Sequence, residues 1–595
     1  MTKTRMPDKE VTEYFTNPHL PAHRQFLALN MFYAEGASAE EVAEAYGYKP
    51  TAVYSFARNF KKSLRESMLK GEDPFFKTIR PGPKGIDRQG GDAELVVAYR
   101  KKMLSIPEIE ILMAGLGRPL SAGTIGAILR ESGFVRLPKR DKATKEEIYR
   151  ESGYARLAEA PCASAVVFDE EELSIPTRAA ALLCFLPIVK HYHIDEAIEN
   201  SSYPGTKQIP TLNAILSFLA LKLSGSGRYG HDDAWCMDRG LGLFAGLNVL
   251  PKTTWLSTYS DKVTRDMNVA FLKDLNRIWK EAGLLGDTAN MDFCAIPYWG
   301  DGDTFERNWS GKRRTALESI EAVLAHDPDT GIISYGDTTV EHDNQSEVVM
   351  EFLDFYCGSE KDGGSLKYLV FDSKFTVLER LGELDDRNIK FLTIQRKGKS
   401  QQEKAASIKD WKTTRVETSN HKSRQVTYAE SETKNYRYGK DKRLRQVFLK
   451  GSHVKHSCII TNDFELSAEL IIRKYARRWM IENEISEHVD FFHLNRNSSG
   501  IVIKVDFDLT MTILAHNLYR LLARGIPRYH HCTAKKLFLS FIDCMGEFDV
   551  GESAVDVKLN LRRGTQLLLE ALPRGPFTYQ WIEDKEFTFQ AGSHS

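Results

Sequence analysis

Three acidic residues stand at positions where polar side chains are rare or carefully spaced. Asp292 lies in the middle of the apolar stretch NMDFCAI, Asp372 ends the apolar stretch KYLVFD, and Glu482 follows the stretch RKYARRWMI. A buried carboxylate needs a cation, which is either a basic side chain or a metal ion. Oxygen ligands that converge from separate elements suit Mg²⁺, which keeps waters and substrate phosphates in its shell. The three carboxylates are therefore candidate magnesium ligands.

Each of these residues also has a purely structural explanation. An aspartate at a strand end often caps a turn, and a glutamate in a helix often faces solvent. Residues 473–490 lack Gly and Pro and carry apolar residues at helical spacing, which predicts a helix. Tyr475, Arg478 and Glu482 are three and four residues apart, so they project from one helical face. A solvated face does not need the tyrosine, and an Arg478–Glu482 salt bridge is the remaining structural explanation.

The segments around the two aspartates alternate between strand and helix patterns. Strands are expected over 288–300, 365–373 and 388–396, a hairpin over 316–336, and helices over 344–356 and 374–385. This order predicts an α/β layer whose strands share one sheet. The chain between Arg396 and Cys458 is polar, strongly basic and rich in Thr, Val and Tyr, which predicts an inserted β-rich subdomain.

The first 70 residues contain the pattern of a DNA-binding module. Helices are predicted over 22–36, 38–47 and 52–70, with Ser38 and Glu41 spaced as a capping box. The third helix carries four basic residues: Arg58, Lys61, Lys62 and Arg65. A short helix, a tight turn and a basic helix form the layout of a helix-turn-helix, whose second helix enters the major groove. Helical pairs of this kind also arise by chance.

Residues 106–145 repeat this pattern after a basic Pro/Gly linker at 75–91. Ser121 is placed to cap a helix that stops at Gly133. Basic residues follow the stop: Arg136, Lys139, Arg140, Lys142 and Lys145. The pattern is typical of a second helix-turn-helix or winged-helix-like unit with a basic exit.

Composition limits the class of protein. The 595 residues contain 81 Lys plus Arg and 81 Asp plus Glu, so only the distribution of charge can indicate a nucleic-acid partner. Eight cysteines occur without a CxxC pair, and the chain begins without an apolar signal segment, which predicts a reducing cytosol. The apolar runs are shorter than the roughly 20 residues that span a bilayer, so no membrane is expected. His530, His531 and Cys532 lack zinc-finger spacing.

The chain resembles bacterial DDE transposases of the insertion-sequence-four type, which are cut-and-paste enzymes with an RNase H-like catalytic core. The signature of that family is Tyr, two residues, Arg, three residues, Glu, six residues, Lys, and YARRWMIE supplies Tyr475, Arg478 and Glu482. The stretches MDFCAIPYWGD and YLVFDSKFTVLERL resemble the family's two aspartate strands. The resemblance covers roughly residues 180–525. Val489 stands where the family has lysine, so His488 or Arg496 takes over its role in holding DNA, or end binding is weakened.

The resemblance implies a mechanism and a set of partners. Asp292, Asp372 and Glu482 would hold two Mg²⁺ ions, for which Mn²⁺ can substitute, and these would promote hydrolysis at element ends and transfer of the freed 3′-hydroxyl into target DNA. Tyr475 and Arg478 would grip a phosphate near the cut, with packing and a local ion pair as the structural alternative. The implied partners are transposon-end DNA and target DNA, held by a homodimer on paired ends in the bacterial nucleoid.

The inserted segment is the second expected DNA contact. Its basic residues would follow the DNA backbone: Lys412, Arg415, Lys422, Arg424, Arg437, Lys440, Lys442, Arg443 and Arg445. Trp411 is a candidate for stacking on an extruded base, and ordinary packing is its alternative.

Together these patterns predict an α/β protein with an RNase H-like core that is interrupted by a β-rich insertion and preceded by α-helical helix-turn-helix units. The expected boundaries are 1–75 for the first helix-turn-helix unit, 76–150 for the linker and second unit, 151–285 for a helical domain, 286–397 for the first half of the core, 398–462 for the basic insertion, 463–530 for the second half of the core, and 531–595 for a C-terminal helical region. Two alternatives remain open: a metal-dependent DNA nuclease of the same fold, and a domesticated or inactive DNA-binding protein derived from a transposase.

Overall fold

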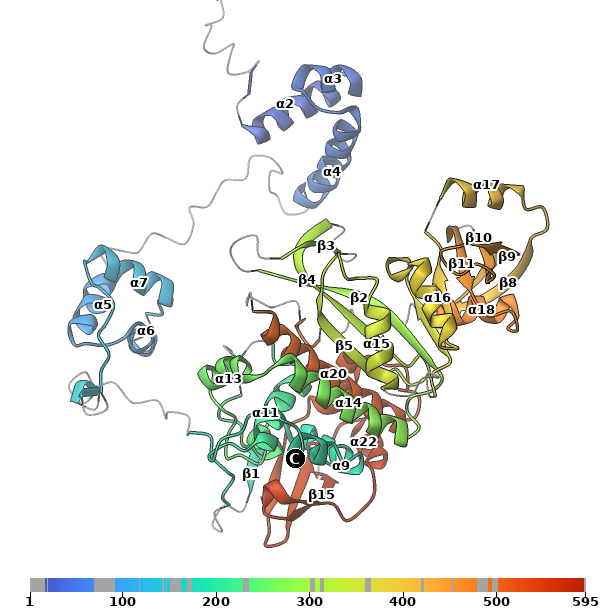
Figure 1. Cartoon of the computed structure of the whole chain (residues 1–595). Coiled ribbons are helices and arrows are strands. Elements are labelled where there is room, and N and C mark those ends of the chain that lie inside the picture. Colours follow the sequence, from blue (N-terminus) through green and yellow to red (C-terminus); the bar gives the residue numbers. More distant parts are fainter. Residues whose placement is uncertain are drawn as a thin grey trace, which may run out of the picture. The chain divides into compact units, whose positions relative to one another are not determined.

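The structure is a computed structural model in which two compact units, Met1–Glu159 and Ala160–Ser595, are distinguished. It describes residues 17–18, 20–68, 91–116, 118–141, 144–145, 147–149, 162–168, 174–227, 229, 235–299, 305–310, 315–358, 365–396, 398–418, 422–451, 454–478, 491–494 and 501–592. The helices of the first unit are drawn in blue, and the second unit runs from teal to red (Figure 1).

The first unit begins with the three helices expected from the sequence: α2 (Pro21–Tyr33), α3 (Ala39–Tyr46) and α4 (Pro50–Met68). The Ser38 hydroxyl accepts the N–H of Glu41 at 3.2 Å, and the Glu41 carboxylate accepts the N–H of Ser38 at 2.8 Å. The predicted capping box is therefore present. Gly47 ends α3 at a φ of +69°, a conformation that favours glycine.

The second group of helices in this unit is α5 (Asp92–Lys101), α6 (Ile106–Gly115) and α7 (Ala122–Glu131). Ser121 caps α7 by accepting the N–H of Thr124 at 3.2 Å, as predicted. The described residues between 91 and 149 contain no strand, so the wing of a winged helix has no counterpart among them. Arg140 was predicted to belong to a group of basic residues that follow the helix and are available to DNA. Its guanidinium instead donates to both carboxylate oxygens of Glu108, at 3.0 and 3.1 Å.

The second unit opens with short helices around a shared core. These are η1 (Ala180–Phe185), α9 (Leu186–His191), α10 (Ile194–Glu199), α11 (Thr211–Leu223), α12 (Arg239–Phe244), α13 (Thr253–Tyr259), η3 (Ser260–Lys262) and α14 (Arg265–Glu281). We expected a separate helical domain over 151–285, but these helices pack into the same hydrophobic cluster as the sheet that follows. Phe218 of α11, for example, lies 5.0 Å from Phe507 between ring centroids.

A ten-stranded sheet forms the centre of this unit. Its strands are β2 (Thr288–Pro297), β3 (Arg307–Ser310), β4 (Thr315–His326), β5 (Ile333–Val340), β6 (Tyr368–Phe371), β7 (Lys390–Ile394), β8 (Lys412–Thr418), β9 (Lys422–Lys434), β10 (Arg443–Gly451) and β11 (Val454–Thr461). The order is β3-β4-β2-β6-β7-β11-β10-β9-β8, with β5 also paired to β4. Strands β5, β4 and β2 are antiparallel neighbours, whereas β2, β6 and β7 are parallel.

Helices cover both faces of this sheet. They are α15 (Val348–Cys357), η4 (Ser373–Phe375), α16 (Leu378–Asp386), α17 (Lys399–Ser407), α18 (Ala468–Ala476) and α20 (Val502–Gly525). Leu392 of β7 packs in a cluster with Ile471 of α18, whereas its neighbour Phe391 packs in the cluster that includes Leu384 of α16. Successive residues of a strand point to opposite faces, so α18 and α16 lie on opposite sides of the sheet.

The basic segment between 398 and 462 contains the predicted strands, but they do not form a separate sheet. β11 pairs antiparallel with β7, with Ile459 opposite Ile394, so β8 to β11 continue the central sheet. An unpaired β7 would expose a row of backbone N–H and C=O groups, and β11 satisfies them.

The prediction of a helical region over 531–595 was wrong. The segment contains the helices α21 (Ala534–Leu537), η6 (Phe538–Ile542) and α22 (Thr565–Ala571). It also contains the strands β12 (Gly546–Val550), β13 (Ala554–Leu559), β14 (Thr578–Tyr579) and β15 (Lys585–Ala591), with η7 (Gln580–Ile582) between the last two. These strands join β1 (Ile175–Thr177) in a five-stranded sheet of order β1-β12-β13-β15-β14. Alternate residues of β13 are buried, which is the period of two that a half-buried strand requires.

Candidate active site

Asp292 lies on β2, and Asp372 directly follows the neighbouring parallel strand β6 at the matching position. Met291 of β2 lies opposite Phe371 of β6, and the aspartates are the next residues on each chain. Residues in register on parallel strands point to the same face, and adjacent strands are about 4.8 Å apart. The two carboxylates therefore belong to one face of the sheet, as neighbours. The sequence predicted both strands, and the register brings the two residues together.

The helix α18 covers that same face. Ser467 caps it by accepting the N–H of Leu470 at 3.3 Å, and Ile471 and Tyr475 pack in a cluster with Val370 of β6. Tyr475 and Arg478 are both 6% exposed. The N–H of Arg478 donates to the carbonyl of Tyr475 at 3.1 Å, so the chain still turns at the end of α18. Both predicted motif residues therefore lie beside the aspartates.

Arg478 forms an ion pair with Asp292, between Nη1 and Oδ2. The other carboxylate oxygen of Asp292 accepts the N–H of Phe293 at 2.9 Å. The side chains are only 7% and 13% exposed, so the attraction is weakly screened by water. From the sequence, a salt bridge to Glu482 was the structural alternative for Arg478. In the structure, Arg478 pairs with Asp292.

Glu482, His488 and Val489 lie outside the described residues, as does the rest of 479–490. The described part of the predicted helix 473–490 ends at Arg478. Among the described residues, no group of three or more His, Cys, Asp or Glu side chains is arranged to hold a metal ion. Asp292 and Asp372 nevertheless supply two adjacent carboxylates, which is the oxygen donor set that Mg²⁺ prefers.

Tyr475 is held as a neutral phenol. Burial raises the pKa of its hydroxyl above the ordinary value, the nearby Arg478 opposes that change, and the charges of Asp372 and Asp292 add to it. The hydroxyl therefore stays protonated at neutral pH. It is suited to donating a hydrogen bond, and it is a poor nucleophile.

Two charged residues behind the aspartates were missed by the sequence analysis. On the opposite face of β4, Glu321 is 2% exposed and accepts a hydrogen bond from Lys374 at 2.8 Å. Lys374 also lies 5.2 Å from the ring centroid of Phe293, which stacks on Phe375 at 4.0 Å. An acidic residue within the apolar run ALESIEAVLAH was the available signal. This pair fixes the turn after Asp372.

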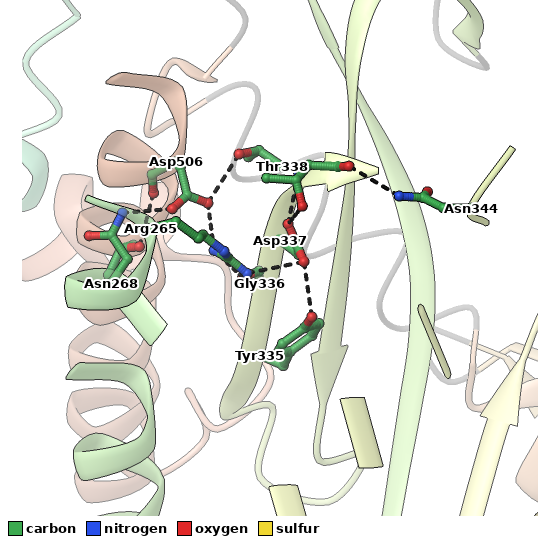
Figure 2. A network of polar contacts seen from close by, with 10 residues as sticks. Arg265, Asn268, Tyr335, Gly336, Asp337, Thr338, Asn344 and Asp506 are labelled. Carbon is green, nitrogen blue, oxygen red and sulfur yellow. Dashed lines mark hydrogen bonds and ion pairs between the residues drawn. The ribbon is translucent and has the colours of Figure 1, made fainter. Parts of the chain in front are cut away.

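A second cluster of buried charges is built around Asp506 and Arg265 and has a structural role (Figure 2). Asp506 of α20 is 1% exposed and accepts hydrogen bonds from Arg265 at 2.6 Å, Asn268 at 2.6 Å and Thr338 at 3.0 Å. Arg265 also pairs with Asp337 at 3.1 Å. The network joins α14, β5 and α20. Because its carboxylates are already bonded to donors from the chain, it stabilises the fold that carries α18 and the aspartates.

The predicted DNA contacts of the first unit lie on one helix. Arg58, Lys61 and Lys62 are exposed on α4, and the Lys61 ammonium lies 5.5 Å from the ring centroid of Tyr33. The side chain of Arg65 lies outside the described residues. The exposed face of α4 is therefore basic.

The basic residues of the segment between 398 and 462 divide into two groups. Several form ion pairs within the chain, of which the last two named lie at the surface: Lys442 with Asp385 and Asp386, Arg445 with Glu430, Arg443 with Glu432, and Arg437 with Glu379. Lys412 and Arg415 are exposed on β8. Trp411 is half-buried, and its N–H donates to the carbonyl of Ile408 at 3.1 Å, which fits ordinary packing.

Comparison with known proteins matches this region to a family. Residues 300–518 match the family model of the transposase DDE domain. The matched segment contains Asp372, Tyr475 and Arg478, and it begins after Asp292. A solved piggyBac transposase synaptic complex with hairpin DNA aligns with 62% of this chain and 82% of its own, at 12% identity and a TM-score of 0.35. No curated protein matches the chain.

The central part of the chain is therefore similar to a transposase DDE domain. The helices in the described parts of the chain are all too short or too polar to cross a membrane.

Proposed function

We propose that the protein is a DDE transposase that cuts the ends of a DNA element and joins them to target DNA. The observation that carries this proposal is the register of Asp292 and Asp372 on one sheet face, directly beside Tyr475 and Arg478. The match of residues 300–518 to the transposase DDE domain supports the same conclusion.

The strand arrangement supports an RNase H-like core. Three antiparallel strands, β5, β4 and β2, are followed by the parallel strands β6 and β7. Asp292 lies on the central β2, and Asp372 directly follows its neighbour β6. The insertion-sequence-four type is favoured by the spacing of Tyr475, Arg478 and Glu482.

Asp292, Asp372 and Glu482 would hold two Mg²⁺ ions, with Mn²⁺ as a substitute. Bound there, the metal would supply charge stabilisation for phosphoryl transfer and a lowered pKa for bound water. The chain's own residues do the rest. Arg478 carries a planar guanidinium that suits phosphate oxygens, and the neutral Tyr475 hydroxyl offers a hydrogen bond to the same group.

DNA recognition is assigned to residues outside this site. The exposed basic residues Arg58, Lys61 and Lys62 on α4 would bind element ends, together with Arg65. Lys412 and Arg415 would contact the DNA backbone, and His488 would take the role of the missing lysine at Val489. A homodimer on paired ends, acting on target DNA in the cytoplasm, completes the proposal.

The test is cleavage and joining of a plasmid that carries the native DNA flanking the coding sequence, with and without Mg²⁺. Asp292→Asn, Asp372→Asn and Glu482→Gln should each abolish cleavage while leaving DNA binding largely intact. Asp354→Asn is the matched control, because that carboxylate is 67% exposed and pairs only at the surface with Arg387. Full cleavage by any of the three variants would overturn the assignment of that residue.

A second function is favoured by Val489 and by the ion pair that Arg478 makes with Asp292. A chain with valine in place of the motif lysine, and with Asp292 paired to Arg478, would bind DNA without cleaving it. Binding of the flanking DNA by the wild type with no cleavage in Mg²⁺ or Mn²⁺ would establish this function. Cleavage without joining would instead indicate a nuclease.

A further inference from the structure

The hairpin of β3 and β4 extends the sheet beyond the strands that carry the aspartates (Figure 1). Residues 319–326 of β4 pair with β2 and residues 315–318 pair with β3, while the carbonyl of Glu318 also accepts the N–H of Tyr298 at 3.0 Å. Trp309 of β3 is 62% exposed, which is unusual for so large an apolar side chain. Its cross-strand partner is the small Ala316, which leaves the indole uncovered.

Trp309 lies on the same face of the sheet as Asp292. Asp292 is opposite Leu324 on β4, and Trp309 is opposite Ala316 on the same strand. Cross-strand partners share a face, and residues an even number of positions apart on one strand also share it. Leu324 and Ala316 are eight residues apart, which is about 27 Å along an extended strand, so Asp292 and Trp309 share one side of β4. Ile320 and Ala322, which lie between them on that side, are buried in the core.

The other side of the hairpin is fixed to the body of the unit. Asn308 is 3% exposed, donates to the carbonyl of Ser319 at 3.1 Å and bonds through its side-chain oxygen to His342 at 2.8 Å. Alternation then turns Arg307 and Trp309 outward. The hairpin is thus held through Asn308 on one side. On the other side it carries the exposed Trp309 and Arg307, whose Nη2 donates to the carbonyl of Ala316 at 3.0 Å.

The chemistry of this outer face suits DNA. Arg307 is exposed, and Glu318 opposite it accepts the N–H of Phe305 at 2.8 Å, so part of that carboxylate is used within the hairpin. An indole offers an apolar ring and one N–H donor, which fit a deoxyribose and a phosphate oxygen.

We propose that Arg307 and Trp309 bind duplex DNA on one side of the cleaved bond. Duplex DNA rises about 3.4 Å per base pair, so 27 Å along β4 corresponds to about eight base pairs from the phosphate at Asp292. Trp309 packs against the sugars there, and Arg307 neutralises one phosphate. This inference rests on the proposed function, because it takes the aspartates as the point of cleavage.

The experiment measures the affinity of the full chain for duplexes of the native flanking DNA, shortened stepwise on either side of the cleavage site. For long duplexes, Trp309→Ala should bind about fivefold to tenfold more weakly than the wild type. Trp309→Phe should retain most of the affinity. Leu539→Ala is the control for loss of an exposed apolar side chain, since Leu539 is 57% exposed elsewhere in the unit. The effect of Trp309→Ala should vanish once the duplex ends before the eighth base pair on one side.

Salt dependence provides an independent measurement. Arg307→Gln should reduce the slope of log affinity against log salt by about one, whereas Trp309→Ala should leave that slope unchanged. Equal affinities of wild type and Trp309→Ala for every duplex would overturn the inference and leave the proposed function standing. A change in oligomeric state without a change in DNA affinity would assign the face to a second copy of the chain and would also overturn it. A wild type that binds no DNA would overturn both proposals.

Discussion

Arg478 and Asp292, which are 186 residues apart in the sequence, form an ion pair that is almost completely buried. A guanidinium and a divalent cation are alternative partners for the same carboxylate charge. When no metal is bound, Arg478 therefore supplies the positive charge that compensates the buried carboxylate of Asp292. It also implies that metal binding and the position of Arg478 are coupled, since a cation at Asp292 weakens the attraction that holds the guanidinium there.

We predict that Arg478→Gln makes the protein less stable without metal and more responsive to metal. Removing one partner of a buried pair costs about 3 kcal/mol, because the remaining charge is left uncompensated. Millimolar Mg²⁺ should therefore raise the melting temperature of Arg478→Gln by more than that of the wild type. Calorimetric unfolding with and without Mg²⁺ measures this difference. Arg478→Lys, which keeps the charge, is the control, and equal shifts in wild type and Arg478→Gln would contradict the coupling.

The network around Asp506 gives a prediction about stability alone. Asp506→Ala leaves Arg265 without its main partner and removes the acceptor for Asn268 and Thr338. We expect the free energy of unfolding to fall by about 3–5 kcal/mol, the usual cost of breaking a buried pair. Urea unfolding of the full chain checks it. Asp354→Asn, at an exposed pair, should change stability by about 1 kcal/mol or less. A similarly small change for Asp506→Ala would show that the network carries little stability.

The stability of the helices α5 to α7 depends on pH through the carboxyl group of Glu108. Burial raises the pKa of its carboxyl, but hydrogen bonds from Arg140, Ser105 and Tyr149 outweigh this and lower it from 4.5 to about 2. A lowered pKa means that the stabilisation is fully present above pH 4.5 and is lost as the pH falls from there toward 2. The shift corresponds to a loss on the order of 3 kcal/mol.

Hydrogen exchange of peptides from α5 to α7, corrected for intrinsic rates, measures this loss between pH 5 and about pH 3. Wild-type protection should fall over that interval. Glu108→Gln should start with lower protection and change little with pH, because it has no carboxyl to protonate. Parallel pH profiles of wild type and variant would show that another group is responsible.

The parts of this fold that the sequence predicted are those governed by neighbours in the chain. Ser38 and Ser121 were recognised as caps because their partners lie three residues away. The strands of Asp292 and Asp372 were recognised from short apolar runs. Their register, and the pairing of Arg478 with Asp292, depend on segments tens to hundreds of residues apart, which no local pattern specifies.

The errors have the same origin. β12 and β13 are only five and six residues long, each carries two charged residues, and β12 pairs with β1 from the distant segment at Ile175. Arg140 was assigned to a free basic exit, although its partner Glu108 lies 32 residues earlier. In each case the deciding contact is between segments that are remote in sequence.

The final prediction concerns the chemical role of Tyr475. Burial raises the pKa of its hydroxyl, so the group remains a neutral donor across the physiological range. Tyr475→Phe should therefore retain cleavage, with DNA affinity reduced about fivefold by the loss of one hydrogen bond of about 1 kcal/mol. Its pH profile between about 7 and 9 should match that of the wild type. Tyr428→Phe is a matched control, since Tyr428 is another tyrosine of the same cluster, and its hydroxyl bonds Glu469 instead. Complete loss of cleavage in Tyr475→Phe, together with a covalent protein–DNA product in the wild type, would assign the tyrosine a nucleophilic role and replace the mechanism based on Asp292, Asp372 and Glu482.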